Sequence, residues 1–248
     1  MKPIILIPAR MASTRLPGKP LADICGVPMI VRVWRRAMAA GLGPVVVAAS
    51  EKEVADAVNA AGGKAVMTDP NLPSGSDRIF AALNAVDRKF EFDTVINLQG
   101  DLPAIEPAYL KAGLDALAAT GSDIATLAAE IDENDPLAAN PNATKAVVAW
   151  DGAEHFGKAL YFTRARAPYG KGPVYFHVGL YIYKREALKR FVSLPPSALE
   201  KREKLEQLRA LEAGLTIGVA KVPAIPLSID TQEDLDAARA AIAKEEAA

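Results

Sequence analysis

The chain has 248 residues, of which half are hydrophobic, 6% are aromatic and 24% are charged. This composition is that of an ordinary globular protein, and it excludes disordered, collagen-like and fibrous chains. Basic and acidic residues nearly balance, with a formal net charge of −1, so we expect no nucleic-acid partner that is held by a basic field.

Alternating strands and helices are expected in the first half of the chain. Apolar runs predict strands at residues 4–7, 45–49, 65–67 and 94–98, and the first two are continuously apolar, as strands buried on both faces would be. Apolar residues at helical spacing predict helices around 30–38, 54–61 and 79–86, the second opened by capping-box spacing at 50–53. Pro107 suits the first turn of a further helix.

The second half has a different pattern. We expect strands at 123–131, 145–150, 175–183 and 215–222, a charged helix over 199–212, and a last helix starting at 231–234. The predicted fold class is α/β, with a mostly parallel twisted sheet flanked by helices and a partly antiparallel inserted region. A single domain over residues 1–248 is expected, with the insert at about 135–185.

The sequence also indicates the cellular compartment in which the protein is expected. Its single cysteine, Cys25, cannot form an internal disulfide and gives no sign of an oxidising environment. The first apolar run is too short for the hydrophobic part of a signal peptide. No stretch approaches the roughly 20 apolar residues of a membrane-spanning helix. We therefore expect a cytoplasmic protein with no membrane insertion.

A basic loop follows the first predicted strand. Ligands of open parallel sheets bind beyond the carboxyl ends of the strands, and this loop places Arg10, Arg15 and Lys19 there. Arginine forks and a lysine point charge suit a polyphosphate, whereas the alternative is a solvated basic loop. Neither GxxxxGK[ST] nor GxGxxG occurs, so the loop is not one of the common phosphate-binding motifs.

Two aspartates end predicted strands and are candidate Mg²⁺ ligands for a bound triphosphate. Asp101 follows the fourth strand and could instead be a turn residue, and Asp230 precedes the last helix and could instead be its cap. Segment 74–78 offers small donors and Arg78 near a helix start, which suits a nucleotide. His177 lies on a tyrosine-rich strand face, where a structural hydrogen bond is the more common role than a catalytic base.

Several longer motifs occur together in this chain. They are Pro8-Ala9-Arg10 with Ser13 to Leu21, Ser74-Gly75-Ser76-Asp77-Arg78, Gln99-Gly100-Asp101, Asn140-Pro141-Asn142, Tyr161-Phe162-Thr163-Arg164, His177 to Tyr181, Leu205-Glu206-Gln207-Leu208-Arg209 and Asp230-Thr231. In this combination the chain resembles the 3-deoxy-manno-octulosonate (Kdo) cytidylyltransferases, or CMP-Kdo synthetases, over roughly residues 3–240. The Tyr-Phe-Thr-Arg and Leu-Glu-Gln-Leu-Arg motifs are the most specific to that branch.

The resemblance implies a nucleotide-diphospho-sugar transferase-like fold and a reaction, CTP + Kdo → CMP-Kdo + pyrophosphate, that serves lipopolysaccharide biosynthesis. It implies a homodimer and Mg²⁺ as cofactor. It also implies roles for individual residues. Catalysis is assigned to Arg10, Arg15, Lys19 and Asp101, and nucleotide binding to the first three of these with Ala9, Thr14, Ser74, Gly75, Arg78 and Gln99. Sugar binding is assigned to Arg164, His177, Tyr181, Glu206 and Gln207, and metal binding to Asp101 and Asp230.

The chain departs from the family pattern at two places. Leu102 stands where many members have Glu, and the stretch 168–176 between two sugar-site motifs is shorter than in many relatives. The alternative acceptor is therefore another sugar acid, such as an amino-substituted Kdo or a sialic acid. A nucleotide-binding regulator and a nicotinamide dehydrogenase are the remaining alternatives. The first is opposed by the presence of Lys19, Asp101 and Asp230, and the second by the missing glycine fingerprint.

Overall fold

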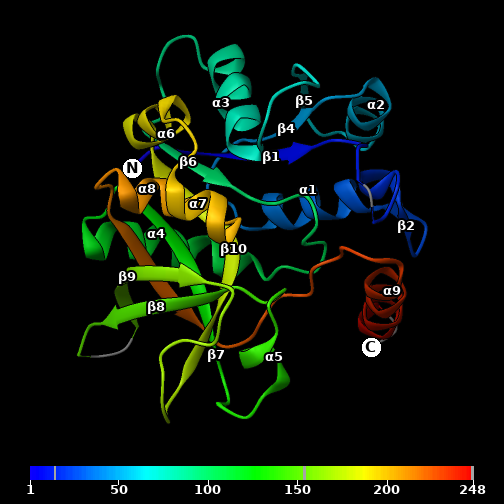
Figure 1. Cartoon of the computed structure of the whole chain (residues 1–248). Coiled ribbons are helices and arrows are strands. Elements are labelled where there is room, and N and C mark those ends of the chain that lie inside the picture. Colours follow the sequence, from blue (N-terminus) through cyan, green and yellow to red (C-terminus); the bar gives the residue numbers. More distant parts are fainter. Residues whose placement is uncertain (14, 153–154, 247–248) are drawn as a thin grey trace. The chain divides into compact units, whose positions relative to one another are not determined.

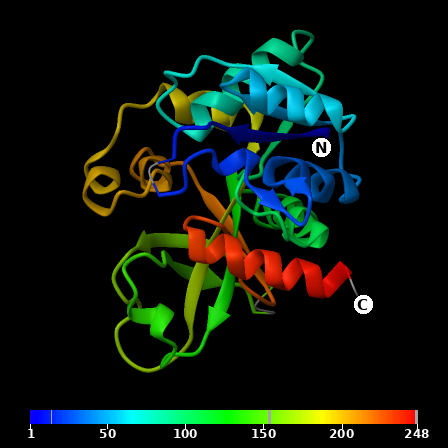
Figure 2. The same cartoon turned by 90° about the vertical axis from the view of Figure 1, so that its right-hand side faces the viewer.

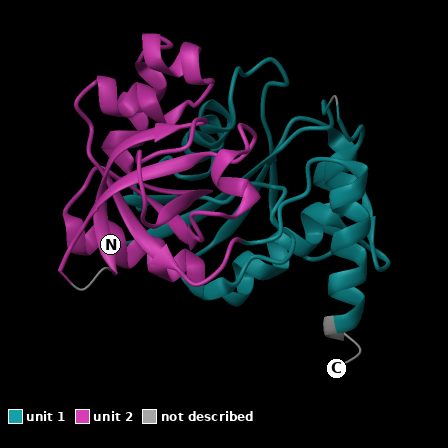
Figure 3. Ribbon diagram, turned by 60° about the horizontal axis from the view of Figure 1, so that its bottom comes forward, with its two compact units in different colours: residues 1–108, 226–248 teal, residues 109–225 magenta. Residues whose placement is uncertain are grey.

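The computed structural model describes residues 1–13, 15–152 and 155–246. The chain divides into two compact units, unit 1 with residues 1–108 and 226–248 and unit 2 with residues 109–225 (Figure 3). The single domain with an insert at about 135–185 stays a prediction, since compactness does not show whether either unit folds alone. Each unit is therefore described by itself.

Unit 1 contains four parallel strands in the order β5-β4-β1-β6 (Figure 1). They are β1 (Pro3–Ala9), β4 (Val45–Ala49), β5 (Ala65–Met67) and β6 (Thr94–Asn97). Each was predicted from its apolar run. The central strand β1 is buried from Ile4 to Ile7, which explains why its sequence is continuously apolar rather than alternating.

Helices connect these strands, as the helical spacing predicted. The connecting helices are α1 (Met29–Ala39), α2 (Lys52–Ala60) and α3 (Gly75–Val86), and α9 (Gln232–Glu246) is added to unit 1 from the end of the chain. A 3₁₀ turn, η1 (Lys19–Leu21), and a short antiparallel pair, β2 (Asp23–Ile24) with β3 (Val27–Pro28), precede α1. These short elements were not predicted.

The predicted capping box at the start of α2 is wrong. The N-cap of α2 is Glu51, and no side chain caps the helix there. The Ser50 hydroxyl instead donates to the Ala9 carbonyl oxygen at 3.2 Å and to the Glu51 carboxylate at 2.7 Å. Ser50 therefore joins the ends of β1 and β4, and its hydroxyl is not available to the helix.

A hydrophobic cluster brings the C-terminal helix to the N-terminal loop of unit 1. Its buried members are Leu16, Ile24, Met29, Ile229, Leu235, Ala238 and Ile242. Figure 2 shows α9 in red as one long helix. Burial of these side chains fixes both the basic loop, through Leu16, and the segment before α9, through Ile229.

Unit 2 contains a mixed sheet with the strand order β10-β7-β11-β9-β8 and an additional β10–β8 pairing. Its strands are β7 (Ile124–Ile131), β8 (Lys145–Trp150), β9 (Phe156–Thr163), β10 (Val174–Lys184) and β11 (Ile217–Val222). Strands β7 and β11 are parallel, and the other pairs are antiparallel. All except β9 were predicted.

Five helices accompany the strands of unit 2: α4 (Pro107–Thr120), which begins at the end of unit 1, α5 (Pro136–Ala139), α6 (Arg185–Ser193), α7 (Ala198–Glu203) and α8 (Gln207–Glu212). The single helix predicted over 199–212 is wrong. Lys204 adopts a left-handed conformation with φ of 56° and ends α7, so α8 starts in a new direction. Leu205 and Leu208 remain buried, as their spacing suggested.

The predicted α/β class is confirmed as a mixed sheet with helices. The mostly parallel arrangement holds for the strands of unit 1, whereas unit 2 carries the partly antiparallel region. Throughout the described residues, every helix is too short or too polar to span a bilayer.

An ion pair between α7 and α8 predicts an acid-sensitive contribution to stability. Arg209 donates to both carboxylate oxygens of Glu200, at 2.8 and 2.7 Å, and both side chains are largely buried. Burial alone would raise the pKa of Glu200, but bonds from Arg209 and the Ser197 amide outweigh it and lower the pKa. The contribution is therefore fully present above the unfolded-state pKa of about 4.3 and is lost as the pH falls through the lower folded-state pKa.

We expect Glu200→Gln to lower the free energy of unfolding by about 2 kcal/mol at pH 7. The difference from wild type should shrink as the pH falls below about 4, because Glu200 of the unfolded wild-type chain is protonated there while the folded chain still carries the charge. Urea denaturation between pH 3 and pH 7 measures this. A difference that stays constant over that range would contradict the role given to the ion pair.

Candidate nucleotide-binding site

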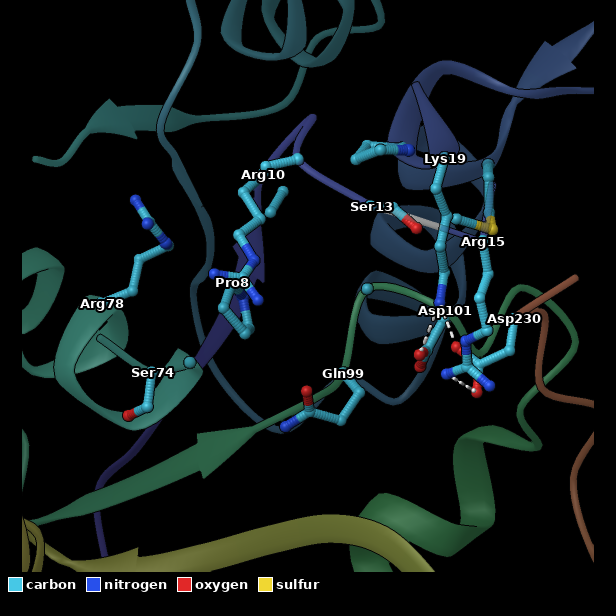
Figure 4. A pocket seen from close by; sticks show the side chains of 16 residues that line it. Pro8, Arg10, Ser13, Arg15, Lys19, Ser74, Arg78, Gln99, Asp101 and Asp230 are labelled. Carbon is cyan, nitrogen blue, oxygen red and sulfur yellow. Dashed lines mark hydrogen bonds and ion pairs between the residues drawn. The ribbon is translucent and has the colours of Figure 1, made fainter. Parts of the chain in front are cut away.

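A cavity of about 400 Å³ opens in unit 1 beyond the carboxyl ends of its parallel strands, and its size is that of a small-molecule site (Figure 4). The segments that build it are the loop after β1, the start of α1, the start of α3, the segment after β6 and the segment before α9. Its lining includes Ala9, Arg10, Ser13, Arg15, Lys19, Ser74, Gly75, Arg78, Gln99, Asp101 and Asp230. Of the predicted nucleotide and metal residues, only Thr14 is missing from this lining, and it lies outside the described residues.

The basic loop after β1 is held at several points along its length. The Glu51 carboxylate accepts a bond from the Met11 amide at 2.9 Å, and the Ser13 hydroxyl accepts one from the Leu16 amide at 3.3 Å. Gly18 has φ of 70°, a left-handed conformation that suits glycine and allows η1 to begin at Lys19. The loop therefore presents its cations from a supported backbone.

Lys19 joins the two predicted metal ligands. Its Nζ lies 2.9 Å from Asp101 Oδ2 and 2.9 Å from Asp230 Oδ1, as the dashed lines in Figure 4 show. Arg15 Nη2 lies 3.0 Å from the other oxygen of Asp230. Burial acts to lower the pKa of Lys19, but the two carboxylates, Asp101 foremost, outweigh it and raise the pKa. Lys19 is therefore protonated at physiological pH.

The helix-cap role left open for Asp230 does not describe its side chain, whereas Asp101 does lie in a turn, as its alternative role predicted. Thr231, not Asp230, caps α9, because its hydroxyl accepts a bond from the Asp234 amide at 3.2 Å. The Asp234 carboxylate accepts the Asp230 amide at 2.9 Å. The Ile229 amide donates to the Asp101 carbonyl oxygen at 3.0 Å, which brings the two aspartates together. Both carboxylates thus remain directed at the cavity and its cations.

The opposite side of the cavity is formed by the start of α3 and the end of β6. Ser74 caps α3 by accepting the Asp77 amide at 3.2 Å. Arg78 is buried and donates to Thr68 Oγ1 at 2.6 Å and to the Asp69 carbonyl oxygen at 3.2 Å, and burial lowers its pKa. Its guanidinium therefore also secures the loop after β5.

The segment after β6 approaches β1 closely. A Cβ atom at Gly100 would lie 2.9 Å from the Pro8 carbonyl oxygen, so only glycine fits there without a shift of the backbone. This close approach sets Gln99 and Asp101 beside the basic loop. Leu102, which stands where many relatives have Glu, is buried and turns away from solvent. It offers no ligand to a metal.

The arrangement of the two aspartates fits Mg²⁺ that is held jointly by protein and phosphate. Their carboxylates bond a single nitrogen atom, so one cation at that position can contact both. The described residues contain no cluster of three or more His, Cys, Asp or Glu side chains that could hold a metal ion. Mg²⁺ is usually bound by one or two carboxylates plus substrate phosphates and water, and this donor set has that form.

The residues predicted for the sugar all lie in unit 2. His177 and Tyr181, both on β10, have ring centroids 5.5 Å apart. Burial, followed by the nearby charges of Tyr183 and Glu206, raises the pKa of Tyr181, so Glu206 belongs to the same group of side chains. Gln207 follows Glu206 at the buried start of α8. Unit 2 therefore brings His177, Tyr181 and Glu206 together, and Gln207 is the next residue in the chain.

The Arg164 side chain bonds backbone carbonyl oxygens at the end of α7 and in the segment before β8. It donates to the carbonyl oxygens of Glu203 at 2.8 Å, Pro141 at 3.0 Å and Lys204 at 3.3 Å. The Glu203 carboxylate accepts the Arg164 amide at 2.9 Å. Each guanidinium nitrogen thus has a partner, while two of the five N–H groups remain for an anion.

His177 is neutral and structural in the free protein. Its Nε2 lies 2.9 Å from Thr126 Oγ1, and burial lowers its pKa to about 3. The Thr126 hydroxyl also lies 2.8 Å from the Leu180 carbonyl oxygen, to which it donates. His177 Nε2 therefore carries the hydrogen and donates to Thr126, as the structural interpretation of this residue anticipated.

Two further residues support these sites, and the sequence analysis did not single them out. Glu51 holds the basic loop, and its position two residues after the end of β4 is a signal that could have pointed to it. Lys145 is fully buried and bonds the carbonyl oxygen of Arg164 at 2.7 Å. No pattern in the sequence distinguishes it from an exposed strand lysine.

Comparison with known proteins identifies relatives over almost the whole chain. A family model described as cytidylyltransferase matches residues 4–217. The 3-deoxy-manno-octulosonate cytidylyltransferases of Parvibaculum lavamentivorans and Paramagnetospirillum magneticum are 61% and 57% identical, over 98% and 97% of this chain and 93% and 97% of their own.

Solved structures are also similar to this chain over almost its whole length. A CMP:2-keto-3-deoxy-manno-octonic acid synthetase complexed with CTP is 41% identical, with a TM-score of 0.89, and the match covers 99% of this chain and all of that one. A cytidylyltransferase from Leptospira borgpetersenii, 19% identical with a TM-score of 0.62, covers 98% of this chain and 87% of its own and shares the fold.

Proposed function

The chain belongs to the 3-deoxy-manno-octulosonate cytidylyltransferase family, and we propose on this basis that the cavity of unit 1 binds CTP for transfer of its cytidylyl group to Kdo. The protein is a nucleotidyltransferase that produces CMP-Kdo from CTP. The observation that carries the proposal is the 61% identity over nearly the full length, together with a cavity lined by four cationic side chains. The finer fold assignment that we propose is nucleotide-diphospho-sugar transferase-like.

In the proposed reaction, the anomeric 2-hydroxyl of Kdo attacks the α-phosphorus of CTP. A bond forms between the sugar oxygen and this phosphorus, the bond to the β-phosphate oxygen breaks, and pyrophosphate leaves while the hydroxyl releases its proton. Such a transfer needs positioning and charge neutralisation more than a covalent nucleophile. Arg10, Arg15 and Lys19 supply fixed positive charge for the triphosphate and the leaving pyrophosphate.

Mg²⁺ is the proposed cofactor, with Asp101 and Asp230 as its protein ligands. When bound, it neutralises phosphate charge during the transfer. We propose Ala9, Thr14, Ser74, Gly75, Arg78 and Gln99 as the residues that hold the nucleotide beside these charged groups. The cap at Ser74 and the bonds of Arg78 support this role, because they fix the start of α3 before a ligand arrives.

For Kdo, we propose Arg164, His177, Tyr181, Glu206 and Gln207 as binding residues. The sugar acid carries a carboxylate, and Arg164 is the cation of this group. Neutral His177 suits hydrogen bonding to a sugar hydroxyl rather than proton transfer, since burial lowers its pKa to about 3.

Arg164→Ala is expected to raise the KM for Kdo by about tenfold or more, the value of one lost charged hydrogen bond, and to leave the KM for CTP within about twofold. Steady-state pyrophosphate release with each substrate varied in turn measures both constants. An equal rise in the two KM values would contradict a contact between Arg164 and the sugar carboxylate.

The proposed function is tested by pyrophosphate release from purified protein with Mg²⁺, CTP and Kdo. UTP, ATP and GTP replace CTP in the controls, and an amino-substituted Kdo and a sialic acid replace Kdo. Release with CTP and Kdo alone supports the proposal. Release only with a modified sugar acid would support the nucleotide site but not Kdo as the acceptor, and would indicate that residues 168–176 select a different sugar. Binding of CTP without release for any acceptor would favour a regulator.

We further propose that the enzyme acts as a cytoplasmic homodimer in lipopolysaccharide biosynthesis, with the insert of about 135–185 contributing to the contact between subunits. The family resemblance supports this. Sedimentation of the purified protein tests the dimer directly.

A further inference from the structure

In the free protein, Lys19 binds the two carboxylates that the proposed function assigns to Mg²⁺. Its Nζ lies at the same distance, 2.9 Å, from Asp101 and from Asp230. The Lys19 side chain is only 14% exposed, whereas the two carboxylates are 29% and 42% exposed. The ammonium group therefore lies between the aspartates, where a cation shared by both would also lie (Figure 4).

The surrounding charge also opposes a metal ion that arrives alone. Arg15 contacts the second oxygen of Asp230 at 3.0 Å, so both oxygens of that carboxylate face a positive group. Among the described residues that line the cavity, four are cationic and two are anionic. A divalent cation that enters without an anion meets a net positive cavity and must displace Lys19.

We propose that Lys19 is an internal counter-ion that excludes divalent metal from the free site, so that metal and nucleotide bind together. This inference rests on the proposed function. A triphosphate offers Lys19 and Arg15 other partners, because phosphate oxygens accept bonds from both side chains. Asp101 and Asp230 then become available to the metal. By linkage, nucleotide and metal each strengthen the binding of the other by the same factor.

The test is binding of Mn²⁺ alone to the full-length protein, measured from the electron paramagnetic resonance signal of the free ion. Without nucleotide, Lys19→Met is expected to bind Mn²⁺ about tenfold or more tightly than wild type, because two carboxylates lose their shared cation. Lys19→Gln should give the same result and replaces the methionine variant if that one does not fold. Lys19→Arg retains the charge and should resemble wild type.

Two controls locate the effect. Arg10→Met removes a cation that lines the same cavity but bonds neither carboxylate in the described structure, so it should tighten Mn²⁺ binding much less than Lys19→Met, by about twofold. Adding Asp101→Asn to Lys19→Met should abolish the gain, which would place the bound Mn²⁺ at this carboxylate pair.

Addition of CTP should tighten Mn²⁺ binding to wild type, so that the Mn²⁺ affinities of wild type and Lys19→Met become more similar. Equal Mn²⁺ affinity of wild type and Lys19→Met in the absence of CTP would overturn the inference, as would a gain that survives Asp101→Asn. Failure of the proposed function has a different signature, because wild type would then release no pyrophosphate from CTP and Kdo whatever its Mn²⁺ affinity.

Discussion

Replacement of Asp101 by Asn is expected to lower kcat for pyrophosphate release from CTP and Kdo by about 100-fold or more, the scale of losing one electrostatic contact to the transition state. The amide keeps the shape of the carboxylate and removes its charge, so the proposed metal site loses one of two protein ligands. Lys19 retains Asp230 as a partner at 2.9 Å. The free energy of unfolding should therefore stay within about 1 kcal/mol of wild type, as for other partly exposed ion pairs.

Steady-state kinetics with saturating CTP and Kdo, and urea denaturation of the same preparations, measure the two effects. Asp115→Asn is the matched control, because Asp115 is a half-exposed aspartate of α4 that pairs with Lys111 on the surface and lies outside the cavity lining. This variant should retain wild-type kcat. An Asp101→Asn enzyme that kept more than half of the wild-type rate with Mg²⁺ would remove Asp101 from the metal site.

Unit 1 and its cavity could be predicted from sequence because both depend on local signals. The strand runs such as 4–7 and 45–49 are apolar over their whole length, and few structures other than buried parallel strands account for such runs. The carboxyl ends of parallel strands share one edge, so polar residues after different strands come together. Arg10, Gln99 and Asp101 meet in the cavity for that reason.

Unit 2 was less predictable because its signals are weaker. Strand β9 buries Gly157 and Ala159 and exposes Lys158 and Leu160. Because its buried residues are small and one exposed residue is apolar, its sequence lacks the alternation of apolar and polar residues that predicts a strand. The break between α7 and α8 depends on Lys204, a residue type with no preference for the left-handed conformation that it adopts. Hydrophobic spacing continues across the break and therefore predicts one helix.

The tertiary contacts between charged groups could not be predicted from the sequence, although the groups themselves could. The helix-cap role that the sequence left open for Asp230 was excluded only by the bond that Thr231 makes to the start of α9. Likewise, the pairing of Lys19 with both aspartates joins residues that are 82 and 211 positions apart in the chain. Residue type and spacing identify such groups as candidates, and the tertiary structure decides which atoms meet.

Lys145 is the clearest case of a hidden tertiary role. Its side chain is fully buried, and its ammonium group donates to three carbonyl oxygens, of Asn140 at 2.8 Å, Ala143 at 2.5 Å and Arg164 at 2.7 Å. Burial, reinforced by the positive charge of Arg164, lowers its pKa. The lysine therefore connects the turn at 140–143, the start of β8 and the residue after β9.

We expect Lys145→Met to lower the free energy of unfolding by about 3–4 kcal/mol, because three carbonyl oxygens, buried or partly buried, lose a charged donor at once. Methionine is similar in length, so the loss reflects bonding rather than a cavity. The variant should also raise the KM for Kdo more than that for CTP, since Lys145 fixes the backbone of Arg164. Urea denaturation and steady-state kinetics below the unfolding transition measure the two effects separately.

The matched control for this variant is Lys158→Met, an exposed lysine in the neighbouring strand β9. It should leave both the free energy of unfolding and the two KM values unchanged. A Lys145→Met protein as stable as wild type would show that water satisfies the three carbonyl oxygens. Reduced stability with unchanged KM for Kdo would limit Lys145 to a structural role. A selective rise in that KM would instead connect the buried ammonium to sugar binding, through the guanidinium whose backbone it holds.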